Sequence, residues 1–555
     1  MLRLPRTLWL SYATDLLRLL SLTAGVLVTI IAFAGAIKPI SDGLLSSADA
    51  LRFVLLAMPP MLAYALPFAG GFASTLVYHR IATDLEATAA YAGGLSHRAV
   101  LAPAAGVAIG CALLLSTLNE IVIPRFLMEM QRLITVDVAR LVGQQVARGQ
   151  SVSFGNVMIH ADRVQNVRPE DGVLDALLLS GFGAVELRDG TPTTEVTSAR
   201  ATLWLLPGAT SADSDLPASR DDEGRTRVVL ELTDVVAARE SGGIGVFSDT
   251  RVSWVVPNTF RDNVKFLSWR DLATIRDTPE RLNWIDPKRK ALALTLARVR
   301  AGEAIEAVLR DAGGVELADD RGGSVRVRAG DVTREDGRLR LAAPAGGAIE
   351  VRTTKAGGGE DAIRAAGGWL EFEDQQAALD PRVRLRLELE GVQAGAGAAA
   401  RPTMAIAGLE PRESALRELL AMGSRELLNV ARARGDGPDA DPDLRDKMYG
   451  PHGLSGALKR LDHDVMAKRH ERLALAASCA VMVLCGAVMA LRLSTRSPLA
   501  VYLFSFFPAL ACLVTISGGQ QVTVKQGAPG LILMWSGVGG LALFTFWVYR
   551  RLARH

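Results

Sequence analysis

Apolar residues are concentrated at the two ends of this 555-residue chain, and a long polar segment separates them. A helix needs about 20 apolar residues to cross the hydrocarbon core of a membrane. Three such runs occur in the first 120 residues and three in the last 85, at residues 16–37, 51–78, 99–118, 473–491, 498–517 and 528–548. The pattern predicts a polytopic membrane domain of six helices, three before and three after a large inserted polar domain.

The first run shares two features with a signal peptide. Arg3 and Arg6 precede it, and Ala34-Gly35-Ala36 has the small residues of a cleavage site. A signal peptide has an apolar stretch of about 7 to 15 residues, whereas this one extends from Leu19 to Ile37. We therefore expect the run to be retained as a transmembrane helix.

Basic residues in the short connections predict the orientation, because cytoplasmic loops carry the excess of Lys and Arg. With the N-terminus inside, the short outer loops hold Lys38, Arg52 and Lys525. The cytoplasmic segments then hold Arg3, Arg6, Arg80, Arg98, Arg492, Arg496, Arg550, Arg551 and Arg554. Both termini are therefore expected in the cytoplasm and residues 120–470 outside. The net charge of +3 adds little, because it averages these compartments.

The polar insert contains two segments with the alternating pattern of β-strands. Short alternating runs such as 156–160 and 227–232 predict an antiparallel β domain, sandwich-like or jelly-roll-like, over residues 150–265. A second β-rich module is expected over residues 301–400, with a Gly/Ala-rich linker at residues 391–400. Helical segments are expected at residues 121–149, 266–300 and 413–470, the last leading into the transmembrane helices of residues 471–555.

The four cysteines agree with this division. Cys111, Cys479, Cys485 and Cys512 all fall within predicted spans. The inserted domain therefore has no disulfide framework, and its stability must come from a packed core.

Motifs for hydrolytic chemistry are missing from the sequence. It contains no Gly-Lys dipeptide, and so no Walker loop, and neither His-Glu-x-x-His nor Gly-x-Ser-x-Gly occurs. We expect that the chain is not an enzyme, has no cofactor and hydrolyses neither ATP nor a peptide itself.

Two weaker signals have simpler explanations. His463 and His470, with acidic residues nearby, could form a metal site, but solvated charge on an exposed helix explains the same residues. The segment 181–183, Gly-Phe-Gly, lacks the third glycine of a dinucleotide fingerprint and is interpreted as a turn.

The connection between the second and third runs predicts a short helix at residues 81–94, ended by a glycine pair, on the cytoplasmic face. Asp84 and Glu86 lie in its first turn, where the helix dipole stabilises anions. A solvated amphipathic connector would have the same composition.

This connection resembles a known family. Glu86, followed eight residues later by Gly94-Leu95-Ser96, is similar to the coupling helix of LptF/LptG (YjgP/YjgQ) permeases. Pro59, Pro60, Pro67, Pro103, the segment 119–124 (Asn-Glu-Ile-Val-Ile-Pro) and the basic segment 467–474 also resemble that family. The insert is about twice the family's usual length, so residues 286–412 have no assigned counterpart.

The resemblance implies a permease subunit of an ABC transporter that extracts lipopolysaccharide from the inner membrane for outer membrane biogenesis. It implies a cytoplasmic LptB-like ATPase dimer, a second permease subunit, identical or diverged, and a periplasmic jelly roll that receives the lipid. An LptC-like bridge protein is a further candidate partner, and no nucleic acid is expected. Glu86, with Asp84 and Gly94, would couple the permease to the ATPase.

Four basic residues are candidates for contact with the anionic headgroup of the lipid. Lys38 resembles the family position that contacts headgroups, and Lys468, Arg469 and Arg472 precede the fourth span. A lone interfacial Lys can equally be an anchor that extends its ammonium group to the surface.

Two alternative functions remain from the sequence. A MacB-type permease also carries a large outer domain, but it has four spans and a fused or adjacent ATPase. A non-transporting scaffold that presents its β domain to a partner would need no ATPase.

Overall fold

The computed structural model describes residues 6–41, 47–126, 152–154, 157–167, 175–188, 191–207, 226–239, 244–255, 264, 267–319, 322–335, 337–344, 347–355, 359–373, 382–394, 401–412, 414–437 and 440–554. The chain divides into two compact units, Met1–Arg276 with Arg460–His555, and Asp277–Lys459. Most of the connector expected at residues 121–149 lies outside the described residues.

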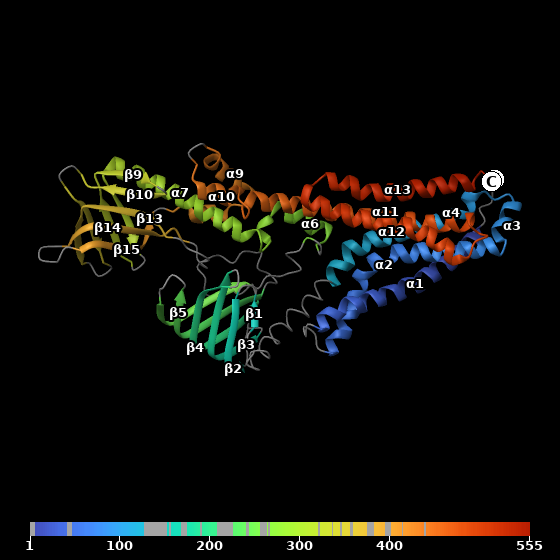
Figure 1. Cartoon of the computed structure of the whole chain (residues 1–555), viewed down its shortest axis with the longest axis horizontal. Coiled ribbons are helices and arrows are strands. Elements are labelled where there is room, and N and C mark those ends of the chain that lie inside the picture. The colour runs from blue at the N-terminus through green and yellow to red at the C-terminus, as the bar shows by residue number, and fades with distance from the viewer. Residues whose placement is uncertain are drawn as a thin grey trace. The chain divides into compact units, whose positions relative to one another are not determined.

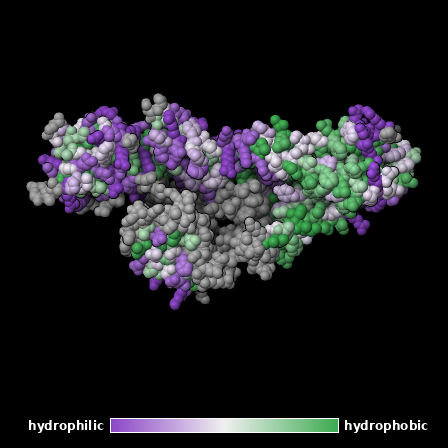
Figure 2. Space-filling view, in the orientation of Figure 1, coloured by the Kyte–Doolittle hydropathy of each residue, from purple (hydrophilic) through white to green (hydrophobic). Residues whose placement is uncertain are grey.

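Six helices are long and apolar enough to cross a membrane (Figure 1), which confirms the number expected from the sequence. They contain α1 (Arg6–Ser41), α2 (Ser47–Thr83), α4 (His97–Thr117), α11 (Leu454–Arg492), α12 (Pro498–Gln526) and α13 (Pro529–Leu552). A short helix α3 (Glu86–Ala92) connects α2 to α4, and a π-helical turn η1 (Leu118–Val122) extends α4. Figure 2 shows an apolar surface over these helices, as expected of side chains that face lipid.

Small residues bring the membrane helices close together. A Cβ atom on Gly486 of α11 would lie 2.2 Å from Oγ of Ser74 and 2.8 Å from Oγ1 of Thr75, both on α2. A Cβ atom on Gly537 of α13 would likewise lie 1.8 Å from Oγ1 of Thr515 on α12. Lipid is as apolar as the helix surfaces, so there is no hydrophobic driving force between membrane helices. They gain packing energy through van der Waals contact, which small residues allow at close approach.

The first β region is one antiparallel sheet in which each strand pairs with the next along the chain. Apolar side chains of Leu179, Phe182, Leu230 and Leu232 form its small core. Its strands are β1 (Val152–Phe154), β2 (Val157–Val167), β3 (Asp175–Arg188), β4 (Thr191–Pro207), β5 (Thr226–Arg239) and β6 (Ile244–Val255). A β-rich insert is thus confirmed, while its jelly-roll form stays a prediction.

The turn expected at residues 181–183 is wrong, because these residues lie inside strand β3. Gly181 has a φ of 62°, and a Cβ atom there would lie 2.0 Å from Oδ2 of Asp162 on β2. Only glycine fits this position without a clash. The glycine therefore produces a local irregularity in a long strand and does not reverse the chain.

The second unit joins helices to a nine-stranded antiparallel sheet (Figure 1). Its inner face carries Leu317, Val325, Val351 and Leu387, against which Ile305 and Leu309 of helix α7 (Asp286–Ala312) pack. The strand order is β12-β11-β8-β7-β15-β14-β13-β10-β9. The strands are β7 (Gly314–Asp319), β8 (Ser324–Arg328), β9 (Asp331–Glu335), β10 (Arg338–Ala342), β11 (Ile349–Thr354), β12 (Glu360–Ala365), β13 (Gly367–Phe372), β14 (Leu385–Ala394) and β15 (Arg401–Pro411).

The linker expected at residues 391–400 is wrong in its first part. Strand β14 continues through Gly391 to Ala394, and Val392 pairs with Arg401 at the start of β15. The glycine- and alanine-rich composition therefore belongs to the end of one strand and the connection to the next.

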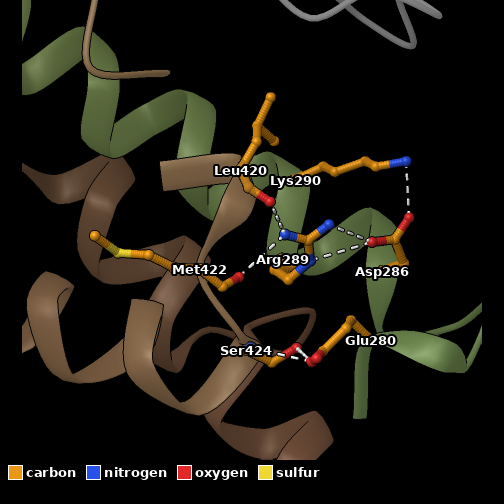
Figure 3. A network of polar contacts seen from close by, with 7 residues as sticks. All are labelled: Glu280, Asp286, Arg289, Lys290, Leu420, Met422 and Ser424. Carbon is orange, nitrogen blue, oxygen red and sulfur yellow. Dashed lines mark hydrogen bonds and ion pairs between the residues drawn. The ribbon is translucent and has the colours of Figure 1, made fainter. Parts of the chain in front are cut away.

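A polar network fastens α7 to the short helices that follow the sheet (Figure 3). Arg289 donates hydrogen bonds to the backbone carbonyls of Leu420 and Met422 and, at 2.8 Å, to the Asp286 carboxylate. Burial alone would raise the pKa of Asp286, but the hydrogen bonds and charges of Lys290 and Arg289 outweigh it and hold this pKa below its usual value. The helices after the sheet are α8 (Leu416–Ala421), α9 (Ser424–Gly435) and α10 (Pro442–Tyr449), and α6 (Trp269–Asp277) and a 3₁₀ turn, η4 (Pro279–Arg281), precede α7.

Candidate functional site

The loop between α2 and α4 folds into helix α3, and the backbone is left-handed on both sides of it. Leu85, just before α3, has a φ of 62° and a ψ of 10°. Gly94, just after it, has a φ of 83°, and its N–H donates to the Tyr91 carbonyl at 2.9 Å. A left-handed conformation costs an L-residue about 1 to 2 kcal/mol. Glycine avoids that cost at position 94, whereas Leu85 is strained.

The exposed surface of this loop is acidic with one apolar side chain at its centre. Asp84 and Glu86 are both exposed, and Leu85 between them has 64% of its surface exposed. Ala87, one residue further, is buried against the helices. Glu86 is the first residue of α3, where unpaired backbone N–H groups favour a carboxylate. The loop therefore presents two carboxylates to a partner, one on each side of a leucine.

The helices beneath the loop are tied to one another by specific polar contacts. Arg80 near the end of α2 forms an ion pair with Asp15 of α1. The Tyr78 hydroxyl donates to the Val100 carbonyl at 3.0 Å and accepts from the Ala104 N–H at 3.2 Å, both on α4. These contacts join α1, α2 and α4 at the end of the bundle that carries α3.

Aromatic side chains fill the space next to α3. Tyr12 of α1 is 2% exposed, and Glu86 is close enough to its hydroxyl to act on it electrostatically. The rings of Tyr91 and His97 lie edge to face with 4.4 Å between their centroids. Burial raises the pKa of Tyr91, and Tyr549 adds to the effect, so this phenol stays neutral. Glu86 is thus exposed, and on its inner side it lies near the Tyr12 ring and within electrostatic range of Arg80.

The three basic residues expected to meet a headgroup on α11 have partners within the chain. Lys468 Nζ lies 2.8 Å from Glu471 Oε2, and both side chains are mostly buried. Arg472 is buried and donates to the Leu267 carbonyl. The guanidinium group of Arg469 lies 5.7 Å from the ring centroid of Trp269, a favourable cation–π distance.

A fourth charged residue joins this group. Glu120 of the π-helical turn accepts a hydrogen bond from the Trp269 N–H at 2.8 Å, and it is also among the charges that act on Arg472. Segment 267–269, at the start of α6, is therefore held by η1 through Glu120 and by α11 through Arg472. The sequence marked Glu120 only as part of a family motif, and it gave no signal for its partner Trp269, 149 residues away.

Lys38, the remaining headgroup candidate, is in the last turn of α1, and its side chain lies outside the described part of the structure. Its role stays a prediction.

The histidines considered as metal ligands contact aromatic and backbone groups. His470 Nδ1 accepts from the Trp535 indole N–H at 3.3 Å, and His463 lies against Gly527. Within the ranges that the structure describes, no group of three or more His, Cys, Asp or Glu side chains could hold a metal ion.

Leu85 is the main feature of the site that sequence reasoning missed. It is the one apolar non-glycine residue with a positive φ in the described ranges. A leucine between two acidic residues, directly after an apolar span, could have indicated an exposed apolar contact, but its strained backbone has no signature in the sequence.

Residues 17–203 match the model of the family described as lipopolysaccharide export system permease LptF/LptG. The matched residues, about a third of the chain, include most of α1, all of α2, α3 and α4, and the first strands of the six-stranded sheet. No curated protein matches the chain. The family match confirms the resemblance suggested by Glu86 and Gly94.

Proposed function

Because residues 17–203 match the LptF/LptG family of lipopolysaccharide export system permeases, we propose that this chain is a permease subunit of an ABC transporter. It extracts lipopolysaccharide, or a related anionic glycolipid, from the inner membrane. The observation that carries the proposal is the position of Glu86, which is exposed at the start of α3 and lies within the matched residues. The six membrane-length helices support the same function.

A separate LptB-like ATPase dimer drives the transporter from the cytoplasm. The Glu86 carboxylate pairs with a basic residue in a groove of the ATPase, Asp84 adds negative charge beside it, and Gly94 ends α3. When the ATPase dimer closes, α3 moves with it, and the contacts Arg80–Asp15 and Tyr78–Val100 support transmission of that movement to α1, α2 and α4.

The lipid leaves a cavity between this chain and a second permease subunit, identical or diverged, and reaches the six-stranded sheet. Both termini are cytoplasmic and residues 120–470 are periplasmic in this arrangement. The apolar side chains of Leu179, Phe182 and Leu230 in the sheet are suited to acyl chains. An LptC-like bridge protein is the candidate that receives the lipid next.

Lys38 and Arg469 remain our candidates for contact with the lipid headgroup. Lys468 would first have to release Glu471 before it could bind the headgroup, and Arg472 would have to release the Leu267 carbonyl. Replacement of Lys38 by Asp should reduce photocrosslinking of anionic glycolipid to the chain, and equal crosslinking would assign it to anchoring alone.

The substitution Glu86→Ala tests the proposed function. We expect it to weaken co-purification of the chain with the ATPase, or to separate ATP hydrolysis from lipid release in proteoliposomes, by about tenfold or more, the range of a lost charge-assisted contact. Thr88→Ala, at an exposed position of the same helix, is the control and should change neither.

The alternatives predict different results. A non-transporting scaffold would capture no ATPase at all, with or without Glu86. Unchanged coupling in Glu86→Ala would contradict the assignment of α3 as the coupling helix.

A further inference from the structure

One face of the nine-stranded sheet carries more arginine than its carboxylates can balance. We call it the arginine face and define it by the side chains that strands β7, β8, β11, β12 and the end of β15 direct away from the core. The charged members are Arg326, Arg328, Arg352, Arg364 and Arg412, which directly follows β15, together with Glu316, Glu350, Glu360 and Glu410. Buried Val325, Val327 and Val351 alternate with them along the strands. The face belongs to the unit Asp277–Lys459, which lies beyond the residues matched to the family.

The strand register places two arginines directly opposite each other. Arg326 of β8 pairs with Arg352 of β11, and like charges in this arrangement destabilise a sheet. On the next row, Glu350 has Arg328 on one side and Arg364 on the other. A small hollow is lined by Arg326, Arg328, Glu350 and Arg352.

The carboxylates on the arginine face are shared among several arginines. Glu316 lies 3.1 Å from Arg326 and 3.5 Å from Arg412. Glu350 lies 3.9 Å from Arg352. Arg326, Arg352 and Arg412 nevertheless keep 54%, 56% and 73% of their side-chain surface exposed. Their guanidinium groups are therefore accessible to a ligand.

The other half of the same sheet provides an internal comparison. On strands β9, β10 and β13, Arg338 pairs with Glu371 at 3.1 Å and Arg340 with Glu335 at 3.4 Å. Arg340 also lies over the ring of Trp369. Arg338 and Arg340 each have a carboxylate of their own, so the sharing of carboxylates on the arginine face is not a general property of this sheet.

We propose that the arginine face binds the phosphate groups on the carbohydrate headgroup of the exported glycolipid, an inference that rests on the proposed function. The planar guanidinium fork matches a phosphate in a bidentate geometry. Adjacent strands are about 4.8 Å apart, so one phosphate can bridge arginines on neighbouring strands and relieve the repulsion between Arg326 and Arg352. The face has no large apolar side chain among its charged rows, so it suits a headgroup and not acyl chains.

Site-specific photocrosslinking in the full-length chain tests this inference. A benzoylphenylalanine replaces Ala362, which pairs with Arg352 on the arginine face, in nanodiscs that contain radiolabelled lipopolysaccharide. Ala405, exposed near the start of β15 and paired with Glu388 of β14, away from the charged members of the arginine face, is the control position. We expect crosslinking at position 362 to exceed that at 405 severalfold and to fall with salt, because exposed charges are screened.

The substitution pair Arg326→Gln and Arg352→Gln should reduce this crosslinking about tenfold. The matched pair Arg338→Gln and Arg340→Gln should leave it unchanged, and a thermal unfolding curve for each variant checks folding. Crosslinking that is as strong with dephosphorylated lipopolysaccharide would overturn the role of phosphate. A protein adduct in place of the glycolipid would assign the face to an acidic partner and overturn the proposal.

A third crosslinker at Ile30, exposed on α1, separates this inference from the proposed function. Lipopolysaccharide captured at position 30 but not at 362 would reject the arginine face and leave the transporter intact. No capture at either position would reject both.

Discussion

The indole N–H of Trp9 donates a 2.8 Å hydrogen bond to the backbone carbonyl of Ala99. In an uninterrupted helix that carbonyl would accept from the N–H four residues later, but residue 103 of α4 is a proline and has none. Trp9 of α1 thus satisfies a carbonyl that Pro103 leaves without its helical donor. The bond ties α1 to α4 next to the α3 loop.

Removal of this donor should destabilise the protein only while Pro103 is present. We expect Trp9→Phe to lower the free energy of unfolding by about 1 kcal/mol, the net contribution of a typical hydrogen bond, because this one is partly buried. In a Pro103→Ala background, where the backbone N–H is restored, the same change should have a smaller effect. Equal losses in both backgrounds, measured by unfolding in detergent, would show that Trp9 acts through packing alone.

Leu85 should have opposite effects on stability and on coupling. Asparagine tolerates the left-handed conformation better than leucine, so Leu85→Asn should keep or raise the free energy of unfolding, by up to about 1 kcal/mol. If the exposed leucine contacts the ATPase, the same variant should lower affinity for the ATPase, because partners usually bury such an apolar side chain.

Leu85→Met is the matched control, since it keeps an apolar side chain at the same strained position. Affinity measured with purified ATPase should follow the order wild type, Met, Asn. Binding of the ATPase by Leu85→Asn as tightly as by wild type would show that the strained leucine has no role in this binding.

The sequence predicted those features that depend on local composition. Hydropathy located the six membrane helices, and alternation located the β-rich insert, because both patterns reflect which side chains face lipid, core or water. The spacing of Glu86 and Gly94 identified the α3 loop, and Gly94 has the positive φ that a helix end requires.

Features that depend on distant contacts were missed or wrong. Gly181 indicated a turn, but pairing with β2 and β4 on both sides of it keeps it in β3, where Asp162 leaves no room for a Cβ atom. Residues 391–394 looked like a linker, but pairing between β14 and β15 makes them part of a strand. The contact of Glu120 with Trp269 joins segments on either side of the six-stranded sheet, and no local pattern predicts such a partner.

The network around Asp286 should make the second unit sensitive to acid. The pKa of Asp286 is lowered in the folded state, so its ionised form stabilises the fold above its unfolded pKa of about 3.9. This contribution is lost as pH falls through the lowered folded value. We expect Asp286→Asn to destabilise the unit at pH 7 by about 1 to 3 kcal/mol, because Arg289 and Lys290 lose a charged partner.

The difference between wild type and Asp286→Asn should disappear at the acid end of the transition. Hydrogen exchange of α7 and α9 amides between pH 7 and pH 3 measures it without unfolding the membrane domain. Glu303→Gln is a control, because its ion pair with Arg434 is more exposed and exposed pairs contribute little. A pH-independent effect of Asp286→Asn would mean that packing and not charge is responsible.

Two buried cysteines offer a direct test of how the helices before and after the insert pack. Cys111 of α4 and Cys479 of α11 are both buried in the core shared by the membrane helices, and their thiols are close enough to influence each other. Mild oxidation with a membrane-permeant reagent should therefore join them, since neighbouring thiols need little backbone movement to form a disulfide.

With a protease site introduced within residues 208–225, the two fragments of the oxidised chain should stay together on a non-reducing gel and separate after reduction. Cys111→Ser should abolish the link, whereas Cys512→Ser should not. Fragments that separate before reduction in the oxidised wild type would contradict the packing of α4 against α11.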